Sequence, residues 1–139
     1  MKVVYNPYIH TGLKILNSPD PKKKVELSLA GLYKEELIDI NYFIPEQPAR
    51  PSKPVLMHPR DMPKRSTSKN GKIALIHALA HIELNAIDLA WDLIVRFGNE
   101  INEKKFFSDW HIVAVDEAKH FKMLNNELIR NNSFYGDLP

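Results

Sequence analysis

Cysteine is absent from the 139 residues of this chain. Disulfide bonds, thiolate zinc sites, iron–sulfur clusters and cysteine nucleophiles are therefore excluded. The formal net charge is only +2, which is too small to indicate nucleic-acid binding by itself. No run approaches the roughly 20 apolar residues that a membrane-spanning helix needs, and the opening MKVVYNPYIHTG does not resemble a secretory signal. We expect a soluble, cytoplasmic protein that does not associate with membranes.

Hydrophobic residues make up 44% of the chain, which is ordinary for a globular domain with a modest core. The pattern of apolar positions is helical, and no stretch alternates as a strand would, so we predict an all-α fold. The predicted parts are an N-terminal helical segment, a proline-rich basic linker, a long antiparallel helical hairpin and a tail, at residues 1–44, 45–67, 68–132 and 133–139.

The N-terminal segment contains one clear start signal for a helix, at Ser18, Pro19 and Asp20. Behind it, apolar residues form a loose helical stripe, and Gly31 weakens the middle of this stripe. Before it, Asn6 and Pro7 are interpreted as a break in a short apolar run. The stripe consists of Val25, Leu29, Leu32 and Leu37.

The linker holds six of the ten prolines. Because proline fixes φ and lacks an amide donor, we expect neither a helix nor a central strand there, but an extended, polyproline-like segment. Residues 50–72 carry seven Lys or Arg and one Asp. This basic run could bind phosphates or RNA, tRNA included, although such runs are more often a solvated surface.

The hairpin is predicted from apolar residues that recur at steps of three and four. Ser66, Thr67 and Ser68 offer N-cap oxygens for a first helix from Lys69 to about Phe97. Gly98 and Asn99 are expected to end this helix, since both residues tolerate the left-handed conformation. A second helix is predicted from about Glu103 to Arg130, and the short connection makes the two helices antiparallel neighbours.

Three residues whose side chains could bind a metal fall on the apolar stripes of these helices. Glu83 lies among Leu79, Ile87 and other apolar residues of the first helix, and Glu117 and His120 lie three apart on the second. Glu83 precedes Gly98 by 15 residues and Glu117 follows it by 19. At these similar depths from the turn the three side chains can meet between the helices.

A buried carboxylate is costly unless it is neutralised, paired or bound to a metal. Carboxylate and imidazole ligands suit iron or manganese. One Glu on one helix and Glu-x-x-His on its partner is half of the di-iron carboxylate arrangement of four-helix bundles. We therefore predict Glu83, Glu117 and His120 as metal ligands. The alternative is a buried Glu–His ion pair that holds the hairpin together.

Other polar residues are weaker candidates. His77 and His81 share one face, together with Asn85 and Asp88, and this face is interpreted as a solvated flank or as support for the metal ligands. His81 and Asp88 are the residues that could orient a ligating histidine. His111 is expected to face outward, and His58 in the linker has no assignment. The aromatic residues are most simply core.

Several stretches resemble one known family. HPRDMPKRS, HALAHIELNAIDLAWDL, DEAKHF and FYGDLP are similar to stretches of the DUF455 proteins, a family of the ferritin-like superfamily that is more distantly similar to the MiaE-type tRNA hydroxylases. The resemblance covers most of the chain. It implies that Glu83 is the ligand from the first bundle helix, and that Glu117 and His120 are the ligands from the second.

The resemblance also implies a missing half. Family members continue past the GDLP loop into two more helices, which would supply another Glu and another Glu-x-x-His, so this chain looks like an N-terminal half. One chain offers too few ligands for two metals. Either two copies pair as a homodimer, or a second polypeptide supplies the other half, or the fragment no longer functions.

Three functions follow from these expectations. The first is a di-iron-type metal-binding protein, completed by homodimerisation, that would carry out oxygen-dependent oxidation or hydroxylation. The second is a non-catalytic helical module that docks on a partner. The third is association with RNA through the basic linker, at Arg60, Lys64 and Arg65.

Overall fold

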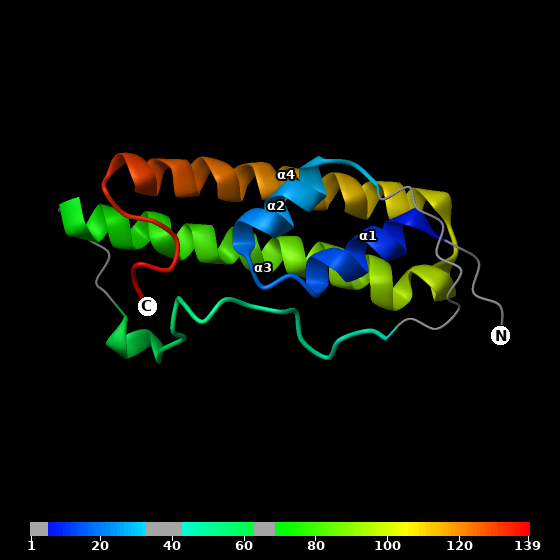
Figure 1. The fold of residues 1–139 in the computed structure, drawn as a ribbon, viewed down its shortest axis with the longest axis horizontal. Helices are drawn as coiled ribbons and strands as arrows, with labels where there is room; N and C mark the ends of the chain where they lie inside the picture. Colours follow the sequence, from blue (N-terminus) through cyan, green and yellow to red (C-terminus); the bar gives the residue numbers. More distant parts are fainter. Residues whose placement is uncertain (1–5, 33–42, 63–68) are drawn as a thin grey trace.

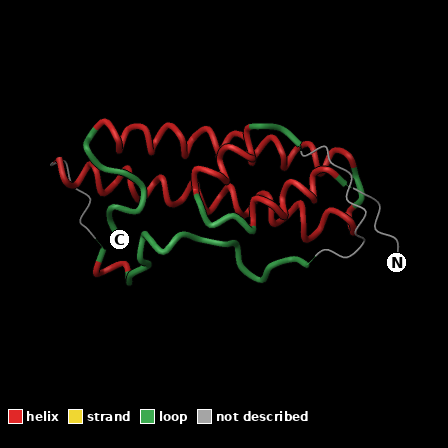
Figure 2. Tube along the Cα trace, in the orientation of Figure 1, coloured by secondary structure: helices red, strands yellow, loops and turns green. Residues whose placement is uncertain are grey.

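Two long antiparallel helices form the body of the protein in the computed structural model, which describes residues 6–32, 43–62 and 69–139 (Figure 1). They are α3, Lys69–Ile101, and α4, Lys104–Arg130. The described part of the chain contains helices and loops but no strand (Figure 2). The all-α prediction is confirmed. The N-cap candidates Ser66–Ser68 and the stripe residue Leu37 lie outside the described residues.

The turn between the two helices differs from the prediction. α3 does not end at Gly98 and Asn99 but continues to Ile101, and Asn102 takes the left-handed conformation with φ 48°. Gly98 has another role, because a Cβ there would lie 2.5 Å from a ring carbon of Phe107 on α4. The absence of a side chain at this position lets the two helices approach each other beside the turn.

Two short helices precede the hairpin. α2, Pro21–Leu29, begins where predicted, with the Asp20 side chain accepting a hydrogen bond from the amide of Lys22. α1, Pro7–Leu16, is absent from the sequence prediction. The Asn6 side chain caps it by accepting hydrogen bonds from the amides of residues 8 and 9, and Pro7 occupies its first position. Asn6 and Pro7 are thus a helix start and not a break.

The core lies between the short helices and one face of the hairpin. α1 packs on α3, and α2 packs on α4 and on α1. The approach of α1 is close, since a Cβ on Gly12 would lie 2.6 Å from a methyl carbon of Val95. The largest fully buried apolar side chains are Ile15, Leu16, Leu84, Ile87, Trp91, Ile94, Val95, Phe121 and Leu128.

A buried ionic network crosses this core. The Lys24 ammonium on α2 lies 2.7 Å from one carboxylate oxygen of Asp88 on α3 and also donates to the carbonyl of Ile15. Arg50 Nε lies 2.9 Å from the other oxygen of Asp88. The side chains of Lys24 and Asp88 are only 0% and 4% exposed. Burial lowers the pKa of Lys24 and raises the pKa of Asp88, and the attraction between the two charges opposes both shifts.

Residues 43–62, which include most of the linker, run along α3 on the side away from α4 (Figure 1). Besides the ion pair of Arg50, the amide of Ala49 donates to the carbonyl of Leu16, and Arg96 donates to the carbonyl of Pro45. One turn of 3₁₀ helix, η1 at Pro59–Asp61, interrupts the extended path. The prediction that no helix forms in this zone is therefore wrong for one turn, which proline can begin because its φ suits a first helical position.

The last residues return from the end of α4 across α3 (Figure 1). The amide of Gly136 donates a 2.9 Å hydrogen bond to His77 Nε2, and the amide of Tyr135 donates to the side chain of Asn125. The ring of Tyr135 stacks on the imidazoles of His77 and His81. The tail is thereby fixed to both helices of the hairpin.

α3 is long and apolar enough, by length and composition, to resemble a membrane-spanning helix. It is the only such helix in the described part of the chain, and 44% of its most apolar window is buried inside the protein. Core helices of soluble proteins have the same properties. The small helical domain is compatible with a soluble protein.

Asp88 gives a direct test of the ionic network. Asp88→Ala leaves the buried Lys24 ammonium with Arg50 as a cationic neighbour and no carboxylate, so we expect the free energy of unfolding to fall by about 3–5 kcal/mol. Asp92→Ala is the matched control, because Asp92 pairs with Arg96 near the surface and should cost about 1 kcal/mol or less. Urea unfolding measures both values, and equal losses would contradict a special role for the buried pair.

Candidate metal centre

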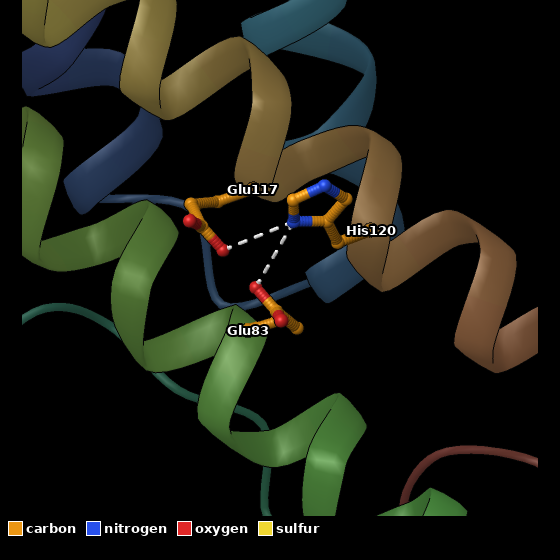
Figure 3. Close-up of side chains that lie close together, drawn as sticks. All are labelled: Glu83, Glu117 and His120. Carbon is orange, nitrogen blue, oxygen red and sulfur yellow. Dashed lines mark ion pairs between the residues drawn. The ribbon is translucent and has the colours of Figure 1, made fainter.

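Glu83, Glu117 and His120 come together on the hairpin as predicted from their spacing (Figure 3). Glu83 projects from α3 toward α4. Glu117 and His120 are three residues apart on α4, which places them on the same side of that helix. One ligand atom from each of the three residues lies within 4.8 Å of the other two.

The imidazole stands between the two carboxylates. His120 Nδ1 lies 3.6 Å from a carboxylate oxygen of Glu83 and 3.5 Å from one of Glu117. These separations are too long for good hydrogen bonds. Ligands held roughly 2.1 Å from one metal ion lie about 3–4 Å from one another. The donor types and both distances therefore fit a shared cation.

The cluster is less buried than its apolar sequence neighbours predict. The side chains of Glu83 and Glu117 are each 24% exposed, and that of His120 is 52% exposed. The expectation that all three lie on a buried stripe is wrong. The N-terminal helices cover another side of α3, around Trp91 and Val95, and the three side chains of the cluster stay partly exposed in the seam between α3 and α4.

An exposed apolar stripe lies beside Glu83. We call it the outer stripe, and its members on α3 are 40–60% exposed and recur at three-, four-, seven- and eight-residue intervals. This spacing places them along one side of the helix, opposite the side that faces the core. Leu79 belongs to this stripe although the sequence places it in the core. The outer stripe consists of Leu75, Leu79, Ile82, Leu89 and Phe97.

Neither carboxylate of the cluster has a basic partner other than His120 among the described residues. Other acidic side chains of the two helices do: Asp92 pairs with Arg96, and Glu127 pairs with Arg130. Two neighbouring carboxylates without a lysine or arginine repel each other. A bound cation would remove this repulsion.

The two residues proposed to support the ligands make other contacts. Asp88 is occupied by Lys24 and Arg50. His81 Nδ1 lies 2.7 Å from the hydroxyl of Tyr135. Neither makes a hydrogen bond or ion pair with Glu83, Glu117 or His120 in the described part of the chain. The structure therefore brings together the three predicted ligands without these two residues.

Two other histidines are less exposed than the sequence predicts. His77 is 2% exposed and holds the tail, so it is not part of a solvated flank. His111 packs its ring against Tyr8 and Trp91, and burial lowers the pKa of His111. Its expected outward orientation is wrong, because Tyr8 of α1 and Trp91 of α3 lie against its ring.

The sequence alone did not identify the residues whose ion-pair partners are distant in the sequence. Lys24 stands in a run of three lysines, and only the fold distinguishes it from Lys22 and Lys23. Arg50 belongs to the basic linker but is bound to Asp88 and Asn85. Of the three arginine and lysine positions suggested for RNA, only Arg60 lies within the described residues, whereas Lys64 and Arg65 lie outside them.

Comparison with known proteins supplies the family. The model of a family described as "Protein of unknown function (DUF455)" matches residues 17–139. The chain belongs to the DUF455 family. An "Uncharacterized protein" from Haemophilus influenzae is 36% identical over 141 aligned residues, which cover 93% of this chain and 49% of that protein. This DUF455 chain thus spans about half the length of the curated relative it matches. No solved structure matches it.

The buried histidines make the stability of this DUF455 protein sensitive to acid. The pKa of His77 is lowered, first by burial and then by the neighbouring His81, while Asp137 opposes the shift. Between its lowered folded pKa and the unfolded value of about 6.5, only the unfolded chain binds the proton. The stabilising effect of neutral His77 is therefore present above about pH 6.5 and lost as the pH falls below that value.

We expect the free energy of urea unfolding to be smaller at pH 5 than at pH 7. His77→Gln removes the titrating group, so the loss between these two pH values should become smaller. His58→Gln, in the exposed part of the linker, is the control and should leave the loss as it is. An unchanged loss in the His77 variant would show that other groups cause the acid sensitivity.

Proposed function

We propose that this protein binds iron or manganese through Glu83, Glu117 and His120, as half of a di-iron carboxylate site that a second copy of the chain completes. The observation that carries the proposal is the convergence of two carboxylates and one imidazole at distances that suit a shared cation and not hydrogen bonds. Oxygen and imidazole ligands are those that iron and manganese accept. The resemblance to ferritin-like proteins supports the same ligands.

The alternative of a structural ion pair explains the geometry less well. A Glu–His pair that held the hairpin together would be expected at hydrogen-bonding distance, and one carboxylate would suffice. Here two carboxylates lie at nearly equal distances from the same nitrogen, 3.6 and 3.5 Å. The three side chains are also partly exposed, so a metal ion can reach them from solvent.

The number of ligands favours a paired site. Di-iron bundles use four Glu and two His, arranged as two single Glu residues and two Glu-x-x-His motifs. One copy of this chain provides half of that set. Two copies related by a two-fold axis would provide all of it, with the same surface of each copy facing the other.

The outer stripe supplies a reason for the copies to pair. Its exposed leucines, isoleucine and phenylalanine lie beside Glu83, and an apolar surface of this kind marks an interaction site. Pairing through the stripe would bring the two clusters toward each other. A second polypeptide that supplies two further helices could cover the same surface, as the relative of twice the length suggests.

The metal centre, when loaded, would supply oxygen-dependent oxidation or hydroxylation chemistry, and this chain supplies the ligands and their surroundings. Glu83 and Glu117 would balance the metal charge, and His120 would contribute the nitrogen ligand. A non-catalytic docking module is the second candidate. The outer stripe favours it as well, and the two functions differ in whether metal binds.

Metal content tests the ligands. On protein purified without chelators, we expect about one iron or manganese ion per chain, measured by elemental analysis. Glu83→Ala, Glu117→Ala and His120→Ala should each reduce the content to background. Glu127→Ala is the matched control, because Glu127 lies on α4 but pairs with Arg130. Unchanged metal content in all three ligand variants would refute the proposal.

Solution mass tests the pairing. We expect a dimer, and Leu89→Lys should shift it to a monomer because the new charge cannot be buried at the interface. Phe43→Lys changes an apolar residue that is 82% exposed elsewhere, and should leave the mass unchanged. Light scattering after size exclusion measures both. If the unsubstituted protein is a metal-free monomer, the result would favour a docking module that binds another polypeptide.

A further inference from the structure

A cavity of about 540 Å³ lies between the linker and the first half of α3. Its size is within the range of about 300–1,000 Å³ that is usual for small-molecule sites. The linker contributes apolar side chains that are unusually exposed, with Leu56 at 78% and Val55 at 58%. Met57 and Met62 line the same wall, and Ala78 and Ile82 line the opposite wall on α3. Ile82 also belongs to the outer stripe, whereas Met57, Met62 and Ala78 do not.

One cationic side chain lines the cavity. Arg60 is the one charged side chain among the described residues that line it, and Pro139, the last residue of the sequence, lines it as well. The linker is held in place nearby, because Arg50 is bound to Asp88 and Asn85 on α3. A fixed apolar cavity with a single cation at its wall selects an apolar ligand with one negative charge.

His81 adds a hydrogen-bond donor. The Tyr135 hydroxyl lies 2.7 Å from His81 Nδ1. When this hydroxyl donates its proton to Nδ1, the ring proton of His81 sits on Nε2. His81 lines the cavity, and its Nε2 has no hydrogen bond to the described part of the chain.

The cavity and the metal centre lie on different sides of α3. Successive residues of a helix are turned by about 100°, so His81 points roughly opposite to Glu83, two positions later. The linker side of α3 is also the side away from α4 (Figure 1), whereas Glu83 faces α4 (Figure 3). A ligand in the cavity would therefore bind without contacting the three metal ligands.

We propose that this cavity is a binding site for a small amphipathic carboxylate. Its apolar body packs between Met57, Met62 and Ala78. Its carboxylate pairs with Arg60 and accepts a hydrogen bond from His81 Nε2. The site requires no metal and does not depend on the proposed function.

Decanoate is a suitable probe because it joins an apolar chain to one carboxylate, and 1-decanol is its uncharged match. We expect saturable binding of decanoate by calorimetry and weaker binding of decanol. Arg60→Gln should weaken decanoate binding at least about tenfold, since a charge-assisted hydrogen bond contributes about 1.5–3 kcal/mol, and should leave decanol binding unchanged. Lys105→Gln removes an exposed charge near the start of α4 and should change neither.

The location is read from amide chemical shifts during the titration. Changes at Met57, Ala78 and His81 support the cavity, whereas changes confined to Leu89 and Phe97 would place the probe on the outer stripe and overturn the proposal. The absence of saturable binding, or equal affinity in the Arg60 variant, would also overturn it. Glu117→Ala should bind decanoate normally, so failure of the metal proposal remains distinguishable from failure of this one.

Discussion

The buried carboxylate of Asp88 joins three parts of the chain. Lys24 ties α2 to α3, and Arg50 brings the linker to the same carboxylate. Trp91, one turn further along α3, donates to Ser28 on α2 and extends the junction. Charges removed from water are favourable only when each partner is in place. The network therefore specifies one arrangement of short helices, linker and hairpin.

This arrangement divides the hairpin into two unlike faces. The inner face is covered by α1 and α2 and contains the apolar core, including Trp91 and Val95. The outer face carries Glu83, Glu117 and His120 beside the outer stripe. Polar groups with the chemistry of metal ligands are thus placed where the fold leaves them accessible. The core stabilises the hairpin without occupying the seam on which the proposed function depends.

Much of the fold and the cluster can be predicted because both follow from local periodicity. Helical spacing locates the two long helices, and the distances from the turn bring Glu83 to Glu117. The burial of the cluster cannot be predicted this way, because it depends on which side α1 and α2 cover. The same limit applies to Lys24, His77 and His111. The burial of each depends on a residue far away in the sequence, and no local sequence pattern indicates that pairing.

The turn at Asn102 and Glu103 limits where residues can be inserted into the chain. It sets the register of α4 against α3, and one inserted residue would shift Glu117 by about 1.5 Å and rotate it by about 100° relative to Glu83. The linker has no such role in the cluster. An insertion in the linker would leave the three side chains together. The same insertion at this turn would separate Glu117 and His120 from Glu83.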